Sequence, residues 1–462
     1  MVLNKFFDST WKVSTFAPMK SVSIIGSGRS SVFLIEYLFK YCQQNNLPFA
    51  VYDKDFSFIH KALPPSMHQC LRTLDINDAD ALNQLVESSQ LVVSMLPAFM
   101  HPVVANLCLK HKVNLATASY ISDALLAMKQ DVESAGLIFM NEVGLDPGID
   151  HMSAMKIMDD LRDKGAIIKG FKSYCGGLVA DEDDGDNPWK YKFSWNPRNV
   201  VLAAQGAPAL FLENGKMKIM PYQQIFQNAE PCYIHDYGWL EAYPNRDSLK
   251  YTDLYDLHDV DDMMRGTFRK SGYCKAWQVF VSLGMTDDAL VLHLPKDCSM
   301  LNWLEMYLPE GQQSPEQRLK EFLNLEDAEI EKLRWLGFFS ENTMPLNIGT
   351  SAQILEKILV DKWVLGEHDR DLVVMQHQIR YALNHKDFIH ESTMVLKGDS
   401  NTHTAMAKTV GLPLAICCKL MLEKSIKRTG VLSPVTKDIY EPILNELSTF
   451  GVHFKDVVKA LS

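Results

Sequence analysis

The chain of 462 residues is acidic, with a formal net charge of −11 at neutral pH and a pI near 5.7, and 47% of its residues are hydrophobic. Its length exceeds the ~250–300 residues at which a single hydrophobic core stops growing, so we predict more than one domain. The composition excludes disordered, collagen-like and coiled-coil classes, and the acidic balance argues against nucleic acid or an anionic membrane as the main partner.

The cysteines and the first residues of the sequence give an expectation about the cellular compartment of the protein. The nine cysteines include no C-x-x-C pair or finger spacing, so we predict neither a disulfide framework nor a metal site. No apolar run approaches the ~20 residues of a membrane helix. The first 18 residues lack both the apolar stretch of a secretory signal and the makeup of a transit peptide. We therefore expect a cytoplasmic protein, not membrane-bound, whose first domain begins near residue 19.

The first domain, residues 19–135, has an alternating pattern of strands and helices. An apolar run from Ser21 is followed by a glycine turn and then by apolar residues at helical spacing. Further buried strands are predicted at 49–52, 91–94 and 113–116. Because parallel strands need crossover helices, this alternation predicts a Rossmann-like α/β domain with a parallel sheet covered on both faces.

A glycine motif marks the start of this domain. Gly26-x-Gly28-x-x-Ser31 directly follows a buried strand and opens a helix, so its amides and the helix dipole can hold a pyrophosphate. Ser31 replaces the usual third Gly or Ala but keeps a small side chain. The pattern favours dinucleotide binding over the alternative, a glycine turn in an unrelated α/β unit.

The cofactor prediction depends on Asp53, at the end of the second strand. A carboxylate there can accept the ribose hydroxyls of NAD and repel the extra phosphate of NADP, so we predict NAD rather than NADP. The neighbouring cations Lys54 and Arg29 blunt that discrimination. The alternative is that Asp53 is only a turn former.

Beyond residue 136 the pattern changes to mixed strands with Gly- and Pro-rich turns. We predict an α+β substrate and dimerisation domain from residues 136–251 and 346–402. Residues 252–345 contain acidic amphipathic helices and are interpreted as a helical insertion. Residues 403–462 are helical again and are expected to return to the first domain.

Several long motifs lie in order along the chain from residue 140 onward. They are MNEVGLDPGIDH, SYCGGL, EAYPNRDS, MMRGTFR and TAMAKTVGLP. Together with GSGRSS and TASYIS they closely resemble the glutamate-forming saccharopine dehydrogenase family. The resemblance implies a homodimeric oxidoreductase of lysine metabolism, for which Asp53 favours NAD as the cofactor. Such an enzyme oxidises saccharopine at its CH–NH group and hydrolyses the imine to glutamate and 2-aminoadipate 6-semialdehyde, or runs the reverse condensation.

The resemblance also implies which residues form the site. Substrate contacts fall on Ser119, Tyr120, Asp146, Arg246, Thr267, Phe268 and Arg269. Cofactor contacts fall on Gly26, Ser27, Gly28, Arg29, Ser30, Ser31, Asp53, Asp75, Ile76, Leu96, Ala118, Leu145 and Trp195.

The chemistry of saccharopine suits these residue types. Its carboxylates need fixed cations, and the guanidinium groups of Arg246 and Arg269 bind carboxylates through paired hydrogen bonds, although surface or interdomain salt bridges would be an alternative role. Amine oxidation and imine hydrolysis benefit from a general base, for which we rank Asp146 ahead of His151. The alternative for Asp146 is a turn residue ahead of Pro147.

Two other functions remain open at this point. A carboxynorspermidine dehydrogenase of polyamine synthesis shares the imine chemistry, but its substrate has fewer carboxylates and would favour acids over the Arg246 and Arg269 pair. A nucleotide-binding pseudoenzyme would keep the fold without turnover. We predict the glutamate-forming saccharopine dehydrogenase activity ahead of both.

Overall fold

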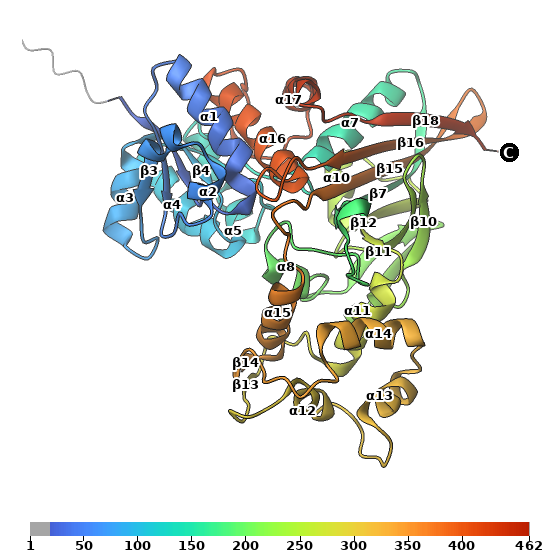
Figure 1. Ribbon diagram of the computed structural model, residues 1–462. Helices are drawn as coiled ribbons and strands as arrows, with labels where there is room; N and C mark the ends of the chain where they lie inside the picture. The colour runs from blue at the N-terminus through green and yellow to red at the C-terminus, as the bar shows by residue number, and fades with distance from the viewer. Residues whose placement is uncertain (1–18, 462) are drawn as a thin grey trace, which may run out of the picture.

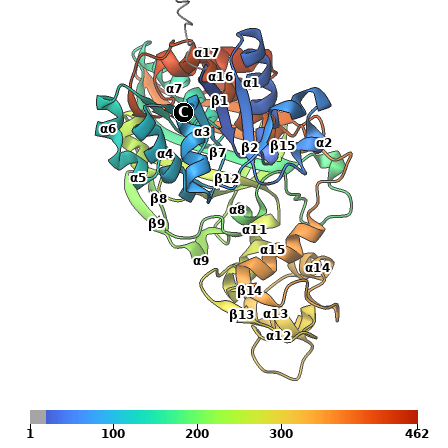
Figure 2. The ribbon, with the colours of Figure 1, turned by 90° about the vertical axis from the view of Figure 1, so that its left-hand side faces the viewer.

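A computed structural model describes residues 19–461, so the expectations for the first 18 residues lie outside the described part. Figure 1 shows three regions: a sheet flanked by helices near the N-terminus, a second large sheet beside it, and a helical region that projects away from both. The view turned by 90° shows the same projection (Figure 2). The predicted α/β class with a second domain and a helical insertion is confirmed.

The first sheet is parallel, with strand order β17-β6-β5-β4-β1-β2-β3. Its strands are β1 (Ser21–Ile25), β2 (Phe49–Asp53), β3 (Leu71–Thr73), β4 (Ser89–Ser94), β5 (Asn114–Ala116), β6 (Ile138–Met140) and β17 (Gly430–Leu432). Successive side chains of a strand point to opposite faces. Val22 and Ile24 therefore pack with α1 and α16, whereas Ile25 packs with α3 and α4. Helices cover both faces, as the sequence pattern predicts.

The helices of the described residues have these bounds: α1 (Val32–Gln44), α2 (Ile59–Ala62), α3 (Ala79–Glu87), α4 (His101–His111), α5 (Asp123–Ala127), α6 (Lys129–Ser134), α7 (Ile149–Arg162), α8 (Pro197–Val201), α9 (Tyr222–Ile225), α10 (Thr252–Tyr255), α11 (Tyr273–Leu283), α12 (Met300–Glu305), α13 (Pro315–Leu323), α14 (Asp327–Leu336), α15 (Ser351–Lys362), α16 (Ala405–Leu422) and α17 (Lys437–Thr449). Short 3-10 turns lie at 29–31, 65–70, 98–100, 181–183 and 249–251.

The second sheet is mixed, with order β10-β11-β12-β7-β15-β16-β18 and the β8–β9 hairpin attached to β12. Its strands are β7 (Ile167–Val179), β8 (Ala209–Glu213), β9 (Lys216–Met220), β10 (Glu230–Ile234), β11 (Gly238–Pro244), β12 (Asp262–Lys270), β15 (Asp371–Leu383), β16 (Lys386–Lys397) and β18 (Lys455–Ala460). Only β12 and β7 pair in parallel. One face of this sheet, with Phe171 and Met375, packs on α7.

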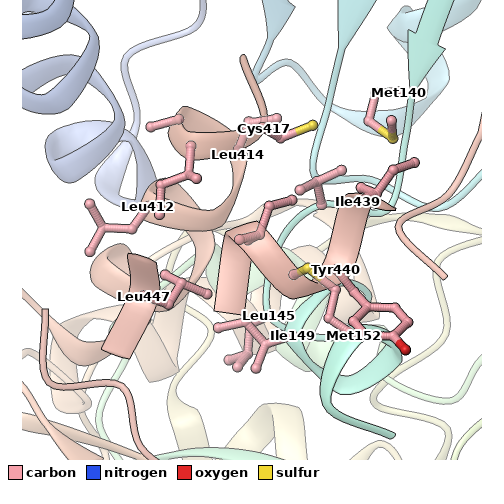
Figure 3. Close-up of a cluster of buried hydrophobic side chains, with 14 of the residues drawn as sticks. Met140, Leu145, Ile149, Met152, Leu412, Leu414, Cys417, Ile439, Tyr440 and Leu447 are labelled. Carbon is pink, nitrogen blue, oxygen red and sulfur yellow. The ribbon is translucent and has the colours of Figure 1, made fainter. Parts of the chain in front are cut away.

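One hydrophobic core joins the first domain to the second. Figure 3 shows clustered side chains from β6, the segment after it, α7, α16 and α17, among them Met140, Leu145, Ile149, Met152, Leu414, Cys417, Ile439 and Tyr440. Burial of this surface fixes α7, whose first residues enter the site described below, against the dinucleotide-binding sheet.

Helix α16 comes closer to membrane-spanning length than the sequence analysis allowed. It has 18 residues and a mean hydropathy of 1.5, which by length and composition is enough to cross a membrane. However, 78% of it is buried inside the protein, between α1 and the core of Figure 3. Its apolar composition is therefore explained by its position in the core.

The structure shifts three of the predicted domain boundaries. β12, which the sequence analysis placed in the helical insertion, is a strand of the second sheet, and β6 lies in the first sheet rather than the second. β18 pairs with β16 and not with the first domain. The polar residues of β12 break the apolar alternation by which a strand is recognised, and pairing partners far along the chain decide its place.

The helical region has an aromatic core of its own. Trp189, Trp277, Trp303 and Trp363 are almost fully buried there, together with residues of α11 to α15. The short strands β13 (Val291–His293) and β14 (Ile348–Thr350) pair at its far end. One of its contacts with the second sheet is made by Glu241 on β11, which accepts hydrogen bonds from the Gly272 and Cys274 amides.

Candidate active site

The residues predicted to bind the cofactor line up at the carboxyl ends of the parallel strands. In an open parallel sheet, ligands bind outside these ends where the strand order reverses, here between β1 and β4. Most of the predicted cofactor residues directly follow or end strands β1 to β5: Gly26, Ser27, Gly28, Arg29, Ser30, Ser31, Asp53, Asp75, Ile76, Leu96 and Ala118.

The glycine turn has the shape that a pyrophosphate requires. Gly26 has a φ of +103°, and a Cβ there would lie 2.9 Å from the carbonyl carbon of Met95. The side of Gly28 where a Cβ would sit is open, with no heavy atom within 4 Å. Ser31 donates to the Gly28 carbonyl from its amide (3.0 Å) and its hydroxyl (2.7 Å), which holds the turn ahead of α1. The open turn and the helix N-terminus fit a dinucleotide phosphate.

Asp53 supports this turn with its carboxylate. One oxygen accepts hydrogen bonds from the Ser27 amide (2.6 Å) and the Ser27 hydroxyl (2.9 Å). The other oxygen accepts from the Lys54 amide at 2.7 Å. Both oxygens therefore already have protein partners, while the side chains of Lys54 and Arg29 beside them are exposed.

A buried histidine orients Ser119. His101 lies between the Ser94 hydroxyl, 2.9 Å from Nδ1, and the Ser119 hydroxyl, 2.8 Å from Nε2, with Thr117 at 3.3 Å. Burial lowers the pKa of His101 to about 4, so the ring is neutral at physiological pH. It therefore fixes the Ser119 hydroxyl without adding a charge to the site.

Tyr120, Asp146 and Arg265 meet where the two sheets adjoin. The Tyr120 hydroxyl donates to Asp146 Oδ1 at 2.9 Å, and Arg265 Nη2 lies 2.6 Å from the same oxygen. The same Arg265 nitrogen lies 2.5 Å from Asp150 Oδ2. The Asp146 side chain is 18% exposed, whereas those of Arg265 and Asp150 are 7% and 2% exposed. Asp146 is thus the acid of this cluster that a ligand can reach.

The pKa values of the two carboxylates in this cluster, Asp146 and Asp150, are shifted in opposite directions. Burial raises the pKa of Asp146 above its usual range, and the Asp150 charge adds to the rise, while Arg265 opposes it. Burial would also raise the pKa of Asp150, but the charges of His151 and Arg265 and the Gly148 amide outweigh it and lower that pKa. A pair with separated pKa values, one of them raised, is typical of acid–base chemistry.

His151 lies behind this cluster. Its Nε2 atom is 3.0 Å from Glu142, its Nδ1 atom contacts the Tyr255 hydroxyl, and its side chain is fully buried. The Glu142 carboxylate also accepts from the Ile121 amide at 3.0 Å. His151 is therefore less accessible to a substrate than Asp146, which supports the order in which we ranked the two as general base.

Strand β12 supplies three more of the predicted substrate contacts, Thr267, Phe268 and Arg269. Arg265, Thr267 and Arg269 share one face because side chains alternate along a strand. Phe268 points to the other face, where it packs 5.2 Å from Tyr174 and is fully buried, so only its backbone is available on the site face.

Arg269 has no acidic partner in the part of the chain that the structure describes. It is 5% exposed, and its guanidinium donates one hydrogen bond, to the Phe268 carbonyl at 3.1 Å. The rings of Tyr191, Tyr243 and Tyr273 surround it with centroids 5.4, 5.8 and 5.3 Å away. Removing a charged group from water costs several kcal/mol, and no counter-ion of the described chain offsets that cost for Arg269. This arrangement therefore points to an anionic ligand.

Three of the predicted site residues lie on a surface turn or within a hydrophobic core. Arg246 is exposed on the turn before Ser248, and its carbonyl accepts from the Leu210 amide at 2.9 Å. Leu145 is 4% exposed and belongs to the core of Figure 3. Trp195 packs between that core and the helical region. Their assignment to ligands stays a prediction.

Arg265, Asp150 and His101 were missed by the sequence analysis. A signal existed for Arg265, because the alternation in MMRGTFR places it on the same strand face as Thr267 and Arg269. Asp150 and His101 carry no comparable signal, since their partners lie far away in the sequence. The fold and the site define a Rossmann-type dinucleotide-binding protein with a separate, charged substrate domain.

Comparison with known sequences identifies the family. Residues 22–140 match the pattern described as "Saccharopine dehydrogenase NADP binding domain" and residues 144–452 match "Saccharopine dehydrogenase C-terminal domain". The chain is 32% identical to "Saccharopine dehydrogenase [NADP(+), L-glutamate-forming]" of Saccharomyces cerevisiae over 449 residues, covering 95% of this chain and 99% of that one. The chain belongs to the saccharopine dehydrogenase family, as its motifs predict.

Other relatives are longer. "Alpha-aminoadipic semialdehyde synthase, mitochondrial" of Mus musculus is 36% identical over 448 residues, which cover 94% of this chain but 47% of that protein. The chain thus spans about half the length of such relatives. Among solved structures, the apo saccharopine dehydrogenase (L-Glu forming) from Saccharomyces cerevisiae matches with a TM-score of 0.83 and 29% identity, over 96% of this chain and 100% of that one.

The prediction of NAD as the cofactor was wrong. The family pattern names an NADP binding domain, and the Saccharomyces cerevisiae relative is named for NADP(+), so NADP is favoured. Asp53 was an insufficient guide to the cofactor, because its two oxygens accept hydrogen bonds from Ser27 and Lys54 and thereby support the turn. Its contact with a ribose stays a prediction.

Proposed function

We propose that the chain oxidises saccharopine with NADP and hydrolyses the resulting imine to glutamate and 2-aminoadipate 6-semialdehyde, or runs the reverse reductive condensation, in lysine metabolism. In the oxidative direction the sum is saccharopine, water and NADP⁺ giving the two products, NADPH and a proton. NADP, when bound, supplies the hydride acceptor. The residues of the chain bind and orient the substrate, exclude bulk water and accept the proton.

The observation that carries this proposal is the uncompensated guanidinium of Arg269. A substrate carboxylate would supply the counter-ion that the tyrosine cage formed by Tyr191, Tyr243 and Tyr273 does not. Arg269 and the Asp146 cluster lie at the two ends of one strand face, and four residues of strand span about 13 Å. That separation suits a long substrate whose reacting amine lies several bonds away from a terminal carboxylate, as in saccharopine.

Asp146 is proposed as the general base. Its carboxylate is the more accessible of the two acids that contact Arg265, and its raised pKa brings it nearer the pH range in which a base works efficiently. In the oxidative direction it would accept the proton of the substrate amine and, after releasing that proton to solvent, accept a proton from the water that attacks the imine. Tyr120 holds the same oxygen by its hydroxyl and thereby orients the carboxylate.

A steady-state assay tests the proposal. Saccharopine with NADP should give NADPH, glutamate and the semialdehyde, and NADP should give a higher kcat/KM than NAD. Carboxynorspermidine should not be turned over, because it has a single carboxylate on a shorter arm and lacks the two carboxylates of the glutamate half. Absence of NADPH formation with saccharopine, while NADP still binds, would instead support a nucleotide-binding protein without turnover.

We also propose that the protein works as a homodimer in the cytoplasm. Tyr233 and Trp239 meet edge-on, with ring centroids 5.3 Å apart, on the outer strands of the second sheet. Both are more than half exposed, which is typical of a contact surface. All nine cysteines are free thiols, as suits a reducing compartment. Light scattering at several concentrations tests the dimer, and cell fractionation tests the compartment; a monomeric mass or recovery with another organelle would contradict these assignments.

A further inference from the structure

We propose that Lys250 is a substrate-binding residue, which receives the carboxylate next to the reacting amine, the α-carboxylate of the glutamate half. The inference rests on the proposed function and adds a residue that neither the sequence motifs nor the family resemblance assigns. It divides the substrate between two cations: Lys250 for the near carboxylate and Arg269 for the far one.

The geometry around Lys250 carries this inference. Its ammonium lies 5.0 Å from the ring centroid of Tyr120 and 4.8 Å from that of Tyr251. Tyr120 is the residue whose hydroxyl donates to Asp146, so Lys250 and the proposed base flank the same side chain. A substrate amine next to a carboxylate is recognised by an acid together with a cation. Asp146 and Lys250, which both contact Tyr120, supply these two charges.

Lys250 is also free to bind a ligand. Its ammonium has no hydrogen bond or ion pair among residues 19–461, and its side chain is exposed. The aromatic rings hold it by cation–π contacts, which leave its N–H groups available. Arg265, by contrast, stacks on the same Tyr251 ring at 4.3 Å but is engaged by Asp146 and Asp150.

A second observation points to the same place. The Tyr251 hydroxyl is buried and has no hydrogen-bond partner in the described residues, although its ring contacts both Lys250 and Arg265. An unpaired buried hydroxyl is costly, so a missing polar partner is expected beside it. A substrate carboxylate held by Lys250 would lie close enough to accept its hydrogen bond.

The test compares Lys250→Met, which keeps the length of the side chain but removes the charge, with Lys250→Arg, which keeps the charge. We expect Lys250→Met to raise the KM for saccharopine roughly 10- to 100-fold, the effect of losing one charge-assisted hydrogen bond. The KM for NADP should stay unchanged, and Lys250→Arg should recover most of the loss. An unchanged KM for saccharopine in Lys250→Met, or an equal rise for both ligands, would overturn the inference.

Two compounds that each correspond to one half of saccharopine show which of its carboxylates Lys250 binds. L-glutamate and L-lysine are used as inhibitors competing with saccharopine, in Lys250→Met and in Arg269→Met. Lys250→Met should weaken inhibition by L-glutamate and leave that by L-lysine unchanged, and Arg269→Met should do the opposite. The reverse pattern would place Lys250 at the far carboxylate and overturn the assignment. Failure of the wild type to oxidise saccharopine would refute the proposed function itself, a result distinct from a normal wild type with a silent Lys250→Met.

Discussion

The two ends of strand β12 handle a buried positive charge in opposite ways. Arg265 lies within 2.6 Å of Asp146 and within 2.5 Å of Asp150, whereas Arg269, four residues along on the same face, is surrounded by three tyrosine rings and has no carboxylate partner in the described chain. A cation paired with acids of the protein stabilises the charges of those acids. A cation without such a partner can bind an anion of the ligand. The same residue type on one strand face therefore has two roles, set by its neighbours.

The largest effect is expected for Asp146, the reachable acid at the compensated end. Asp146→Asn keeps the shape but removes the proton acceptor, so kcat should fall by about 10²–10⁴-fold while NADP binding persists. Because burial raises the Asp146 pKa, wild-type oxidation should be lost as the pH falls through a value above that of an ordinary aspartate. The variant should lack this acidic limb in its pH–rate profile. A near-normal kcat would reduce Asp146 to a turn residue.

Removal of the compensated cation should cost stability. Arg265→Met leaves two buried carboxylates without their partner, so the free energy of unfolding should fall by about 3–5 kcal/mol. Denaturant titration measures this loss. The double variant with Asp150→Asn should recover part of it, since one of the unpaired charges is gone. A stability loss within experimental error would mean that Arg265 does not compensate these acids.

Removal of the uncompensated cation should instead cost binding. Arg269→Met deletes a charge that no acid of the protein balances, so the free energy of unfolding should change by less than about 1 kcal/mol or rise. Binding of saccharopine should weaken by about 2–5 kcal/mol, seen as a higher KM, because its carboxylate loses the guanidinium. The KM for NADP is the control. A large loss of stability without a change in the saccharopine KM would break the comparison.

The smallest effect extends the comparison to the cofactor side. Asp53 is compensated by local donors, so Asp53→Asn should weaken the glycine turn while keeping one acceptor for the Ser27 amide. We expect kcat/KM to fall for NADP and NAD alike, by the factor that corresponds to about 1 kcal/mol of free energy. The ratio of the two values, measured in wild type and variant, is the readout. A changed ratio would show that Asp53 does contact the ribose.

The sequence by itself determined the dinucleotide-binding half and the family. A glycine turn between a buried strand and an amphipathic helix is a local pattern, and Gly26, Gly28 and Ser31 lie where that pattern predicts. The motifs around Asp146 and Arg269 likewise marked the substrate half. These features could be predicted because each depends on residues within one turn or one strand of the chain.

Only the tertiary structure decided which charges are compensated. Asp53 was assigned to NAD from its place on a strand, but its partner Ser27 lies 26 residues away, and that contact makes it a turn support. Arg265 meets Asp150 across 115 residues, and no local pattern records that pairing. The physical reason is that local spacing fixes which face a side chain points to, whereas its neutral or charged role depends on burial and on partners that only folding brings within hydrogen-bond distance.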